Sequence, residues 1–316
     1  MRSIPRLKPG RPDLRKYAEA FDVPEAAGEA PLSVTFLGVS TLLFDDGRSA
    51  LLTDGFFTRP GPLSVLARRL RPDRGLVARC LERAAPSRIE AVVPVHTHFD
   101  HVLDSATVAQ HTGAVLLGGA SAANVARGHG LPEARIETVG PGQDRSAGPY
   151  GLTFVPSAHC PPDRYPGTVG APVAREARAS SYRCGETWSL LVRHRPSGRT
   201  ALVQGSAGFV PYALDGRRCE VAYLGVGGLG LRPESYIRAY WHHTVRAVGA
   251  RYVVLTHWDD FFRPLDRPLR ALPYAGDDFD VTMRLLGQEA DADGAALRLP
   301  RAWRREDPWA RGGTPR

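Results

Sequence analysis

The chain has 316 residues, 43% of them hydrophobic and 23% charged, which is typical of a globular protein that can bury a large core. Its net charge of +8 invites a nucleic-acid interpretation, but nearly all of the basic residues are scattered arginines without interleaved aromatic residues, a pattern that does not favour nucleic acid as a partner. No apolar run reaches the roughly 18 residues of a membrane span, and no transmembrane segment is expected.

Residues 1–30 combine proline, glycine, alanine and charge without clean periodicity, which predicts an N-terminal arm. Residues 31–316 are expected to form one domain with a C-terminal extension. The segment Met1–Lys16 is basic and broken by proline, so it does not resemble a secretory signal. The four cysteines show no CxxC spacing, and we therefore expect reduced thiols in a cytoplasmic protein.

Short apolar runs predict the first strands, at 32–37, 41–44 and 50–53. Asp46-Gly47 lies between the second and third runs and is a strong two-residue hairpin signal. Asp54-Gly55 follows the third run, and in isolation this dipeptide is typical of a turn.

The rest of the chain alternates between strand and helix patterns, which indicates an α/β layer arrangement. Helices are predicted at 62–85 (broken by Pro72), 102–111, 121–128, 233–248 and 281–286. Further strands are predicted at 89–95, 114–117, 135–139, 152–158, 188–194, 200–204, 219–224 and 251–256.

The strand 89–95 delivers three imidazoles and a carboxylate into six consecutive positions. These residues are His96, His98, Asp100 and His101. A strand end followed by a helix start is rigid and can hold such a cluster in a fixed geometry. Neutral imidazole nitrogens and carboxylate oxygens are the ligands of zinc and similar divalent metals, so the cluster predicts a metal site. Two later strands also end at histidines, His159 and His257, although a lone histidine there is usually structural.

The order His-x-His-x-Asp-His after an apolar strand is the signature of the metallo-β-lactamase superfamily, which this chain resembles over roughly residues 32–262. The resemblance implies a four-layer αβ/βα sandwich, with two mixed sheets face to face and helices outside. It also implies two metal positions, the first held by His96, His98 and His159 and the second by Asp100, His101 and His257. In the family an aspartate at the place of Asp54 supports these ligands by hydrogen bonding.

One position departs from the family pattern. Most members have an aspartate that bridges two metals where this chain has Ser206, within the run 204–208. A neutral hydroxyl is a poor zinc ligand and supplies no bridging charge. Either two metals are bridged only by water or hydroxide, with Ser206 beside them, or the second site is weak and one metal is used.

Other features refine the resemblance. The glycine run 225–230 lacks the Lys-Ser/Thr of a phosphate-binding loop and is similar to a turn in lactonase-like and phospholipase-like members. His257-Trp258-Asp259 resembles the ascorbate-lactonase-like and N-acyl-phosphatidylethanolamine phospholipase-like branch, with Asp259 and Asp260 expected as capping or loop residues. The loop 161–185 is long enough to be functional. It offers Tyr165, Tyr182 and Arg183 as substrate contacts.

These observations predict a metallo-hydrolase. One or two zinc ions, with manganese or iron as alternatives, would lower the pKa of a water to about 7 and give hydroxide at neutral pH. Asp100 and His257 are the predicted catalytic residues, and Tyr182 is a candidate proton donor. The expected substrate is a small molecule with an ester, lactone or phosphodiester bond.

Two alternatives stay open at this point. One is a phosphodiesterase acting on nucleic acid or phospholipid, and the other is a non-catalytic metal-binding or diiron redox protein on the same fold. The fold does not choose among these chemistries. No sequence pattern defines an oligomeric state.

Overall fold

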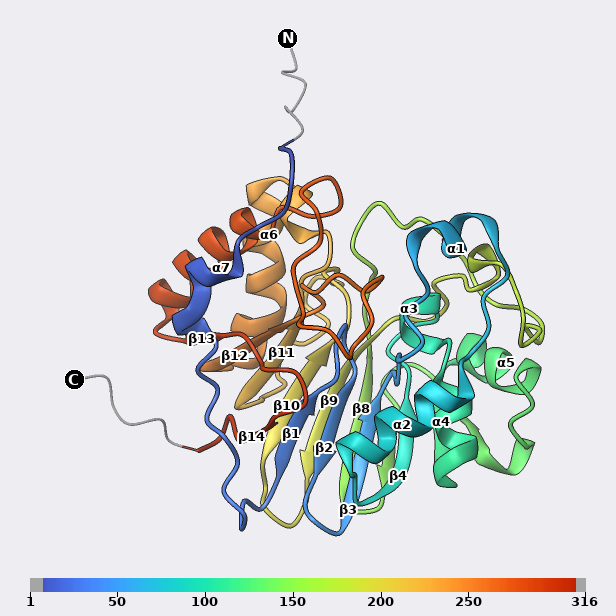
Figure 1. The fold of residues 1–316 in the computed structure, drawn as a ribbon. Coiled ribbons are helices and arrows are strands. Elements are labelled where there is room, and N and C mark those ends of the chain that lie inside the picture. Colours follow the sequence, from blue (N-terminus) through green and yellow to red (C-terminus); the bar gives the residue numbers. More distant parts are fainter. Residues whose placement is uncertain (1–7, 311–316) are drawn as a thin grey trace.

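Two seven-stranded mixed sheets pack face to face and carry helices on their outer faces in the computed structural model, which describes residues 8–310 (Figure 1). The predicted αβ/βα sandwich is therefore confirmed. Of the predicted N-terminal arm, residues 1–7 lie outside the described residues.

The first sheet contains β1 (Ser33–Phe36), β2 (Leu42–Asp45), β3 (Ser49–Thr53), β4 (Arg88–Val93), β5 (Val115–Gly118), β6 (Ile136–Thr138) and β14 (Arg305–Glu306). Its strand order is β14-β1-β2-β3-β4-β5-β6. Pairing is antiparallel from β14 to β3 and parallel from β3 to β6. The parallel strands β4 and β5 carry short buried apolar runs, as expected where both faces of a strand are covered.

The second sheet contains β7 (Asp144–Ala147), β8 (Tyr150–Pro156), β9 (Trp188–His194), β10 (Thr200–Gln204), β11 (Val221–Gly225), β12 (Tyr252–Thr256) and β13 (Ala296–Arg298). Its strand order is β13-β12-β11-β10-β9-β8-β7. Pairing is antiparallel from β7 to β10 and parallel from β10 to β13. Each sheet therefore has an antiparallel half and a parallel half, and parallel neighbours need a crossover connection.

The α-helices are α1 (Pro62–Ala67), α2 (Arg74–Ala84), α3 (Phe99–Val102), α4 (Ser105–Thr112), α5 (Ala120–Gly128), α6 (Glu234–Trp241) and α7 (Phe279–Asp293). Short 3₁₀ segments lie at Leu14–Ala20, Glu133–Arg135, Ala179–Ser181 and Leu229–Leu231, and a π-helical turn at His242–Arg246 continues α6. Figure 1 shows α2, α4 and α5 on one side of the molecule and α6 and α7 on the other, with the strands between them. No helix within residues 8–310 combines the length and apolar character needed to cross a bilayer.

The main core lies between the two sheets. Phe44 of β2 and Tyr223 of β11 meet there edge to face with ring centroids 5.8 Å apart. The buried Tyr150 of β8 donates its hydroxyl hydrogen bond to the first sheet, where the carbonyls of Phe44 and Ser49 lie 3.2 and 2.9 Å away. Burial of each large apolar side chain contributes about 1.5–3 kcal/mol, so this layer fixes how the two sheets meet.

Several predicted elements differ in extent. Two helices, α3 and α4, replace the helix predicted at 102–111, and the Asp104 carboxylate between them accepts hydrogen bonds from the backbone of Phe57 and Thr58. The helix predicted at 281–286 is longer, and the strands β7, β13 and β14 were not predicted. These three strands are short and carry charged residues, so they show neither alternation nor an apolar run.

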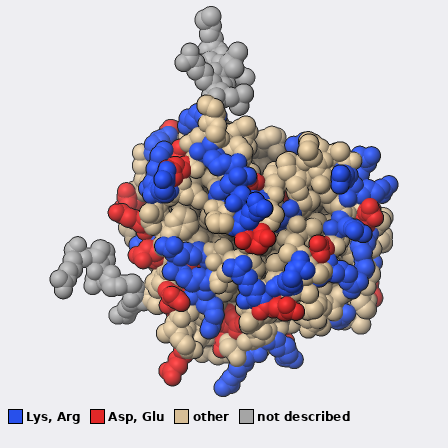
Figure 2. Space-filling model, viewed as in Figure 1, with Lys and Arg blue, Asp and Glu red and all other residues tan. Residues whose placement is uncertain are grey.

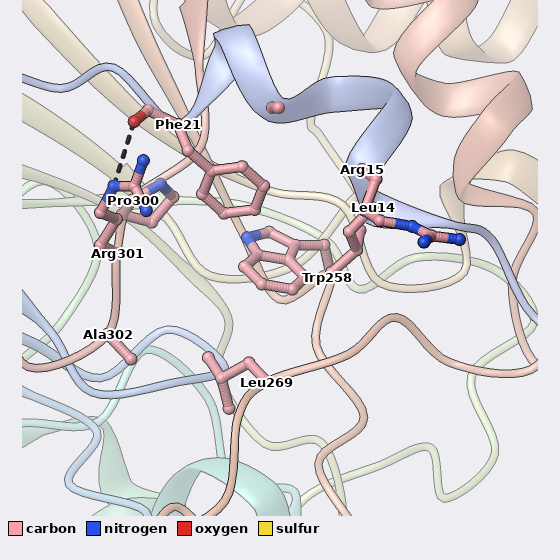
Figure 3. A pocket seen from close by; sticks show the side chains of 9 residues that line it. Leu14, Arg15, Phe21, Trp258, Leu269, Pro300, Arg301 and Ala302 are labelled. Atoms are coloured by element: carbon pink, nitrogen blue, oxygen red, sulfur yellow. Dashed lines mark hydrogen bonds between the residues drawn. The ribbon is translucent and has the colours of Figure 1, made fainter.

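The N-terminal segment from residue 8 packs on the second sheet's side of the molecule. Phe21 lies edge to face on Trp258, with ring centroids 5.8 Å apart. Together with Arg301, whose guanidinium donates to the carbonyl of Phe21, they line a pocket of about 540 Å³ (Figure 3). No predicted metal ligand lines this pocket. Figure 2 shows Lys and Arg spread over the visible face with Asp and Glu among them.

Candidate metal centre

The predicted ligands meet at one edge of the sandwich because the strands that carry them end there. His96 and His98 follow β4 of the first sheet, and His159 and His257 follow β8 and β12 of the second. Asp100 and His101 lie on α3, directly after His98. The centre is therefore assembled by both sheets.

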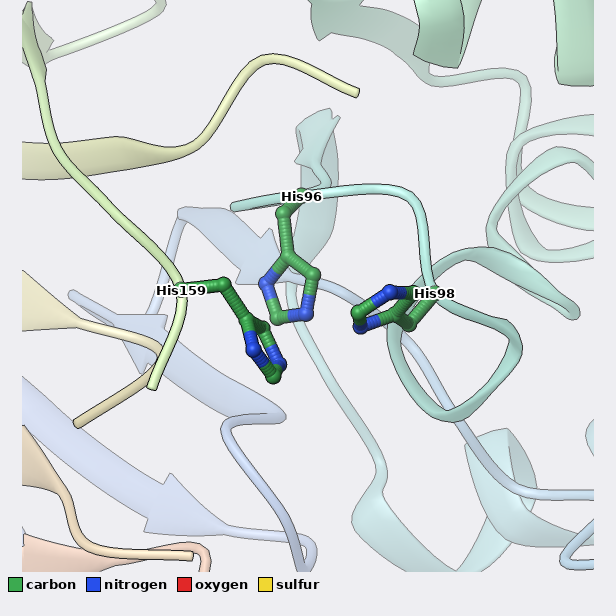
Figure 4. Close-up of side chains that lie close together, drawn as sticks. All are labelled: His96, His98 and His159. Carbon is green, nitrogen blue, oxygen red and sulfur yellow. The ribbon is translucent and has the colours of Figure 1, made fainter. Parts of the chain in front are cut away.

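The ligand atoms form two groups, each with its atoms within 4.8 Å of one another. The first group is His96, His98 and His159, and the second is Asp100, His101 and His257. Figure 4 shows the three rings of the first group gathered together. The groups adjoin, since the ring centroids of His96 and His101 are 3.8 Å apart. The structure thus brings together all six side chains, in the same two groups of three that the resemblance implied.

The unpartnered nitrogens of these rings fit metal ions. Both ring nitrogens of His96, Nε2 of His101 and Nδ1 of His257 are buried without a hydrogen-bond partner among the described residues. Buried polar atoms in folded proteins nearly always have a partner, so such a concentration of unpartnered ring nitrogens calls for a ligand. A divalent cation bound by imidazole and carboxylate would take one nitrogen of each ring.

The pKa shifts of His96, His159 and Asp100 favour the protonation states that bind cations. Burial, and then the neighbouring imidazoles, hold the pKa of His96 well below its usual value. Burial likewise lowers the pKa of His159 to about 4. Burial alone would raise the pKa of Asp100, but His101 and His257 outweigh it and lower that pKa. Neutral imidazoles and an ionised carboxylate are the forms that metals need.

Asp54, for which the resemblance implies a supporting role, contacts His101 of the second group. Its side chain is fully buried, with Oδ2 2.8 Å from Nδ1 of His101 and Oδ1 accepting a hydrogen bond of 2.9 Å from the backbone of Val95. This contact occupies Nδ1 of His101 and leaves Nε2 toward Asp100, whose Oδ2 is 3.7 Å away. A carboxylate on the far nitrogen fixes the orientation and tautomer of a ligating histidine.

An ion pair that the sequence did not predict fixes His257. Arg59 and Asp259 are completely buried and their Nη2 and Oδ2 atoms are 2.6 Å apart. The other oxygen of Asp259 accepts from the backbone N–H of Val39, whose carbonyl accepts from the N–H of His257 at 2.7 Å. Asp259 was expected only to cap or to lie in a loop, yet it connects the strand end that carries His257 to the first sheet.

Ser206 lies beside the centre without a carboxylate's charge. Its hydroxyl, 4% exposed, accepts a hydrogen bond of 3.0 Å from the backbone N–H of Cys160, the residue after His159. Its backbone carbonyl accepts from the Gln204 side chain and from the Tyr240 hydroxyl. The serine therefore fixes the segment that carries His159.

The three predicted substrate contacts lie in different environments in the structure. Tyr165 is half-buried and its ring centroid is 6.4 Å from that of His98, so it lies at the centre. Arg183 is exposed on the same loop. Tyr182 was wrongly predicted as a substrate contact and proton donor: its side chain is fully buried, and its hydroxyl is 3.2 Å from Nε2 of the buried His129.

Close packing accounts for glycines in the run 225–230. A Cβ on Gly227 would lie 2.8 Å from Nδ1 of His257, and one on Gly230 would collide with the backbone of Asp278. These positions need glycine so that the turn can approach the His257 ring and the start of α7.

Comparisons with known proteins agree with this architecture. Igni18, a metallo hydrolase from the archaeon Ignicoccus hospitalis, superposes with a TM-score of 0.53 at 16% identity, over 87% of this chain and 96% of that one. CmlA, a diiron β-hydroxylase from Streptomyces venezuelae, gives 0.53 at 14% identity, over 87% and 53%. Unliganded yeast PDE1 gives 0.51 at 11% identity, over 87% and 99%. At these identities the likeness concerns the fold alone.

A search of curated proteins finds no match to this chain. Residues 34–179, which include five of the six candidate ligands, match the family model described as the metallo-beta-lactamase superfamily. The sandwich fold and the order of the histidines are both consistent with this match. This match spans 146 of the 316 residues, and over that region the chain is similar to the metallo-β-lactamase superfamily.

Proposed function

We propose that this protein is a zinc-dependent hydrolase acting on an ester, lactone or phosphodiester bond of a small molecule. The observation that carries the proposal is the pair of adjoining ligand groups, each with three ligand atoms within 4.8 Å of one another. Three protein ligands per ion leave coordination positions free, which is the arrangement of catalytic rather than structural zinc sites.

The ions would be held by His96, His98 and His159 and by Asp100, His101 and His257. When bound, they lower the pKa of a water to about 7 and stabilise a developing oxyanion. Asp100 keeps its negative charge and lies 3.4 Å from Nε2 of His257. It can therefore accept a hydrogen bond from the attacking nucleophile and orient it. Tyr165 lies next to His98, where it can contact the bound substrate.

Zinc is favoured over iron by the residue types. Five of the six ligands are histidines, which suit zinc, and the carboxylate that would bridge two irons is replaced by Ser206. The His257-Trp258-Asp259 run and the Gly227 turn packed on His257 support the lactonase-like and phospholipase-like branch. Substrate screening should therefore begin with lactones and phosphodiesters.

The deciding measurement is the metal content per chain, by elemental mass spectrometry, of the wild type and Ser206→Asp. We expect close to two zinc ions in the wild type, with little change in the variant. One zinc, rising to two in Ser206→Asp, would instead mean chemistry with a single ion. Iron, or no transition metal, would overturn the zinc proposal.

Turnover is then tested on a panel of esters, lactones and phosphodiesters. We expect His96→Ala and chelator treatment each to abolish hydrolysis, and zinc to restore it only in the chelated wild type. A wild type that binds zinc but hydrolyses nothing on the panel would favour the non-catalytic metal-binding alternative.

A further inference from the structure

The loop between β8 and β9 does more than border the centre, because it is bonded to the stretch that carries two ligands. Thr97 lies between His96 and His98, and its backbone N–H donates to the carbonyl of Cys184 at 2.8 Å. Its hydroxyl donates to the carbonyl of Arg183. Gly185 has a φ of +65°, and a Cβ there would lie 2.5 Å from the Thr97 hydroxyl. The loop therefore fits closely around Thr97.

The same loop brings a carboxylate to His98. Oδ1 of Asp163 lies 3.1 Å from Nε2 of His98, and it also accepts a hydrogen bond of 2.9 Å from the backbone N–H of Tyr165, which fixes its position. The His98 side chain is 8% exposed and the Asp163 side chain 23%. Nε2 is buried and has no aligned hydrogen-bond partner in residues 8–310, although this oxygen is within hydrogen-bond distance.

We propose that Asp163 is a positioning residue that receives the Nε2 hydrogen of His98 and so directs Nδ1 toward the ion of the first group. The proposal rests on the metal-dependent function proposed above. A neutral imidazole has one N–H and one lone pair, so the acceptor on one nitrogen decides which nitrogen can bind a metal. Asp163 would thus do for His98 what Asp54 does for His101, from a loop instead of a strand end.

A competing arrangement uses the same atoms. Ligand atoms of His98, Asp163 and Cys184 lie within 4.8 Å of one another and could hold an ion of their own. That ion would need one ring nitrogen of His98 while the first group uses the other, which leaves the ring without its hydrogen. The Cys184 thiol is also 3.3 Å from the Thr187 hydroxyl, a hydrogen bond that an ion would disrupt. The positioning role needs neither change.

Metal affinity separates the two arrangements. We expect Asp163→Ala to weaken binding of one zinc by about 10–100-fold and to speed its loss to a chelator. Asp163→Asn keeps an oxygen acceptor and should recover most of the loss. Cys184→Ser and Glu176→Gln, an exposed carboxylate change on the same loop, should leave both ions in place. Unchanged affinity in Asp163→Ala, or loss of an ion in Cys184→Ser, would overturn the positioning role.

A second readout needs neither metal nor substrate. Two-bond ¹H–¹⁵N spectra of the metal-free protein report which nitrogen of His98 carries the hydrogen. We expect the Nε2–H form in the wild type and in Asp163→Asn, and a mixture of both forms in Asp163→Ala. A wild type in the Nδ1–H form would contradict the proposal. Because this test does not depend on hydrolysis, failure of the hydrolase proposal would be seen separately.

Discussion

The two ligand groups are held by different kinds of structure. The second group, Asp100, His101 and His257, is fixed by carboxylates with no exposed surface that bond to backbone of the first sheet and to Arg59. The first group depends on the loop between β8 and β9, through its contacts with Thr97 and His98. One half of the centre therefore belongs to the core, and the other half is completed by irregular chain.

Three residues around the second group also have strained backbone conformations. Val39, Asp54 and His257 have φ values of +53°, +54° and +56°, in the left-handed region that is unfavourable for residues other than glycine. Such conformations persist only where the surrounding contacts impose them, and each costs about 1–3 kcal/mol. The contacts that impose them are those of Asp259 and Asp54. We therefore predict that substitutions around the second group lower the free energy of unfolding of the whole protein. Substitutions in the loop between β8 and β9 should mainly affect the first group.

The largest effect is expected from Arg59→Met. Removing the guanidinium leaves Asp259 buried without its partner, which should lower the free energy of unfolding by about 3–5 kcal/mol. The Val39–His257 contact should loosen as well, so the second ion should bind more weakly. Urea denaturation and zinc titration measure the two effects. Arg284→Met breaks an exposed pair with Glu234 and should cost no more than about 1 kcal/mol; an equal cost in both variants would refute the special role of the buried pair.

A smaller steric effect is expected from Gly227→Ala. The added methyl group would meet the His257 ring at 2.8 Å, and relieving such overpacking costs about 1–3 kcal/mol. We therefore expect weaker binding of the second ion by roughly tenfold or more, measured by zinc titration. Gly287→Ala in α7 meets no atom within 4 Å and should stabilise the helix slightly while leaving zinc affinity unchanged. Equal zinc affinity in the two variants would count against this contact.

A further effect concerns the pH dependence of stability near the loop between β8 and β9. His129 follows α5 and contacts Tyr182 of the loop, and burial, with Arg175 adding to it, lowers its pKa to about 4. An unfolded histidine has a pKa of about 6.5, so the unfolded state binds more protons between these values and acid favours unfolding. The stabilisation is present above pH 6.5 and is lost as the pH falls toward 4.

His129→Gln tests this dependence. Between pH 7 and pH 5 the wild type should lose roughly 2 kcal/mol more stability than the variant, measured by denaturation at both pH values. The other buried histidines titrate in both proteins, so the difference isolates His129. Parallel losses in the two proteins would show that His129 does not link the loop to pH.

The clustering of the candidate ligands could be predicted from the sequence, partly for a physical reason and partly from the family resemblance. Four ligands are consecutive or nearly so after one apolar strand, and strand ends in an α/β sandwich meet at one edge. The residues that position the ligands could not be found in this way. Arg59 and Asp259 are 200 residues apart, and Asp163 reaches His98 only through the folded loop. Tyr182 was misjudged because a tyrosine in a polar loop looks exposed, whereas this loop returns its apolar residues to the core beside α5.

The last strand of the first sheet has a consequence for synthesis. β14 pairs with β1 through Val34 and Glu306, so the edge of that sheet is completed by almost the final described residues. While the chain emerges from the ribosome, β1 has its hairpin partner β2 on one side and an open row of backbone donors and acceptors on the other. An open strand edge is a template for pairing with another chain. Aggregation of nascent or truncated chains should therefore begin at β1.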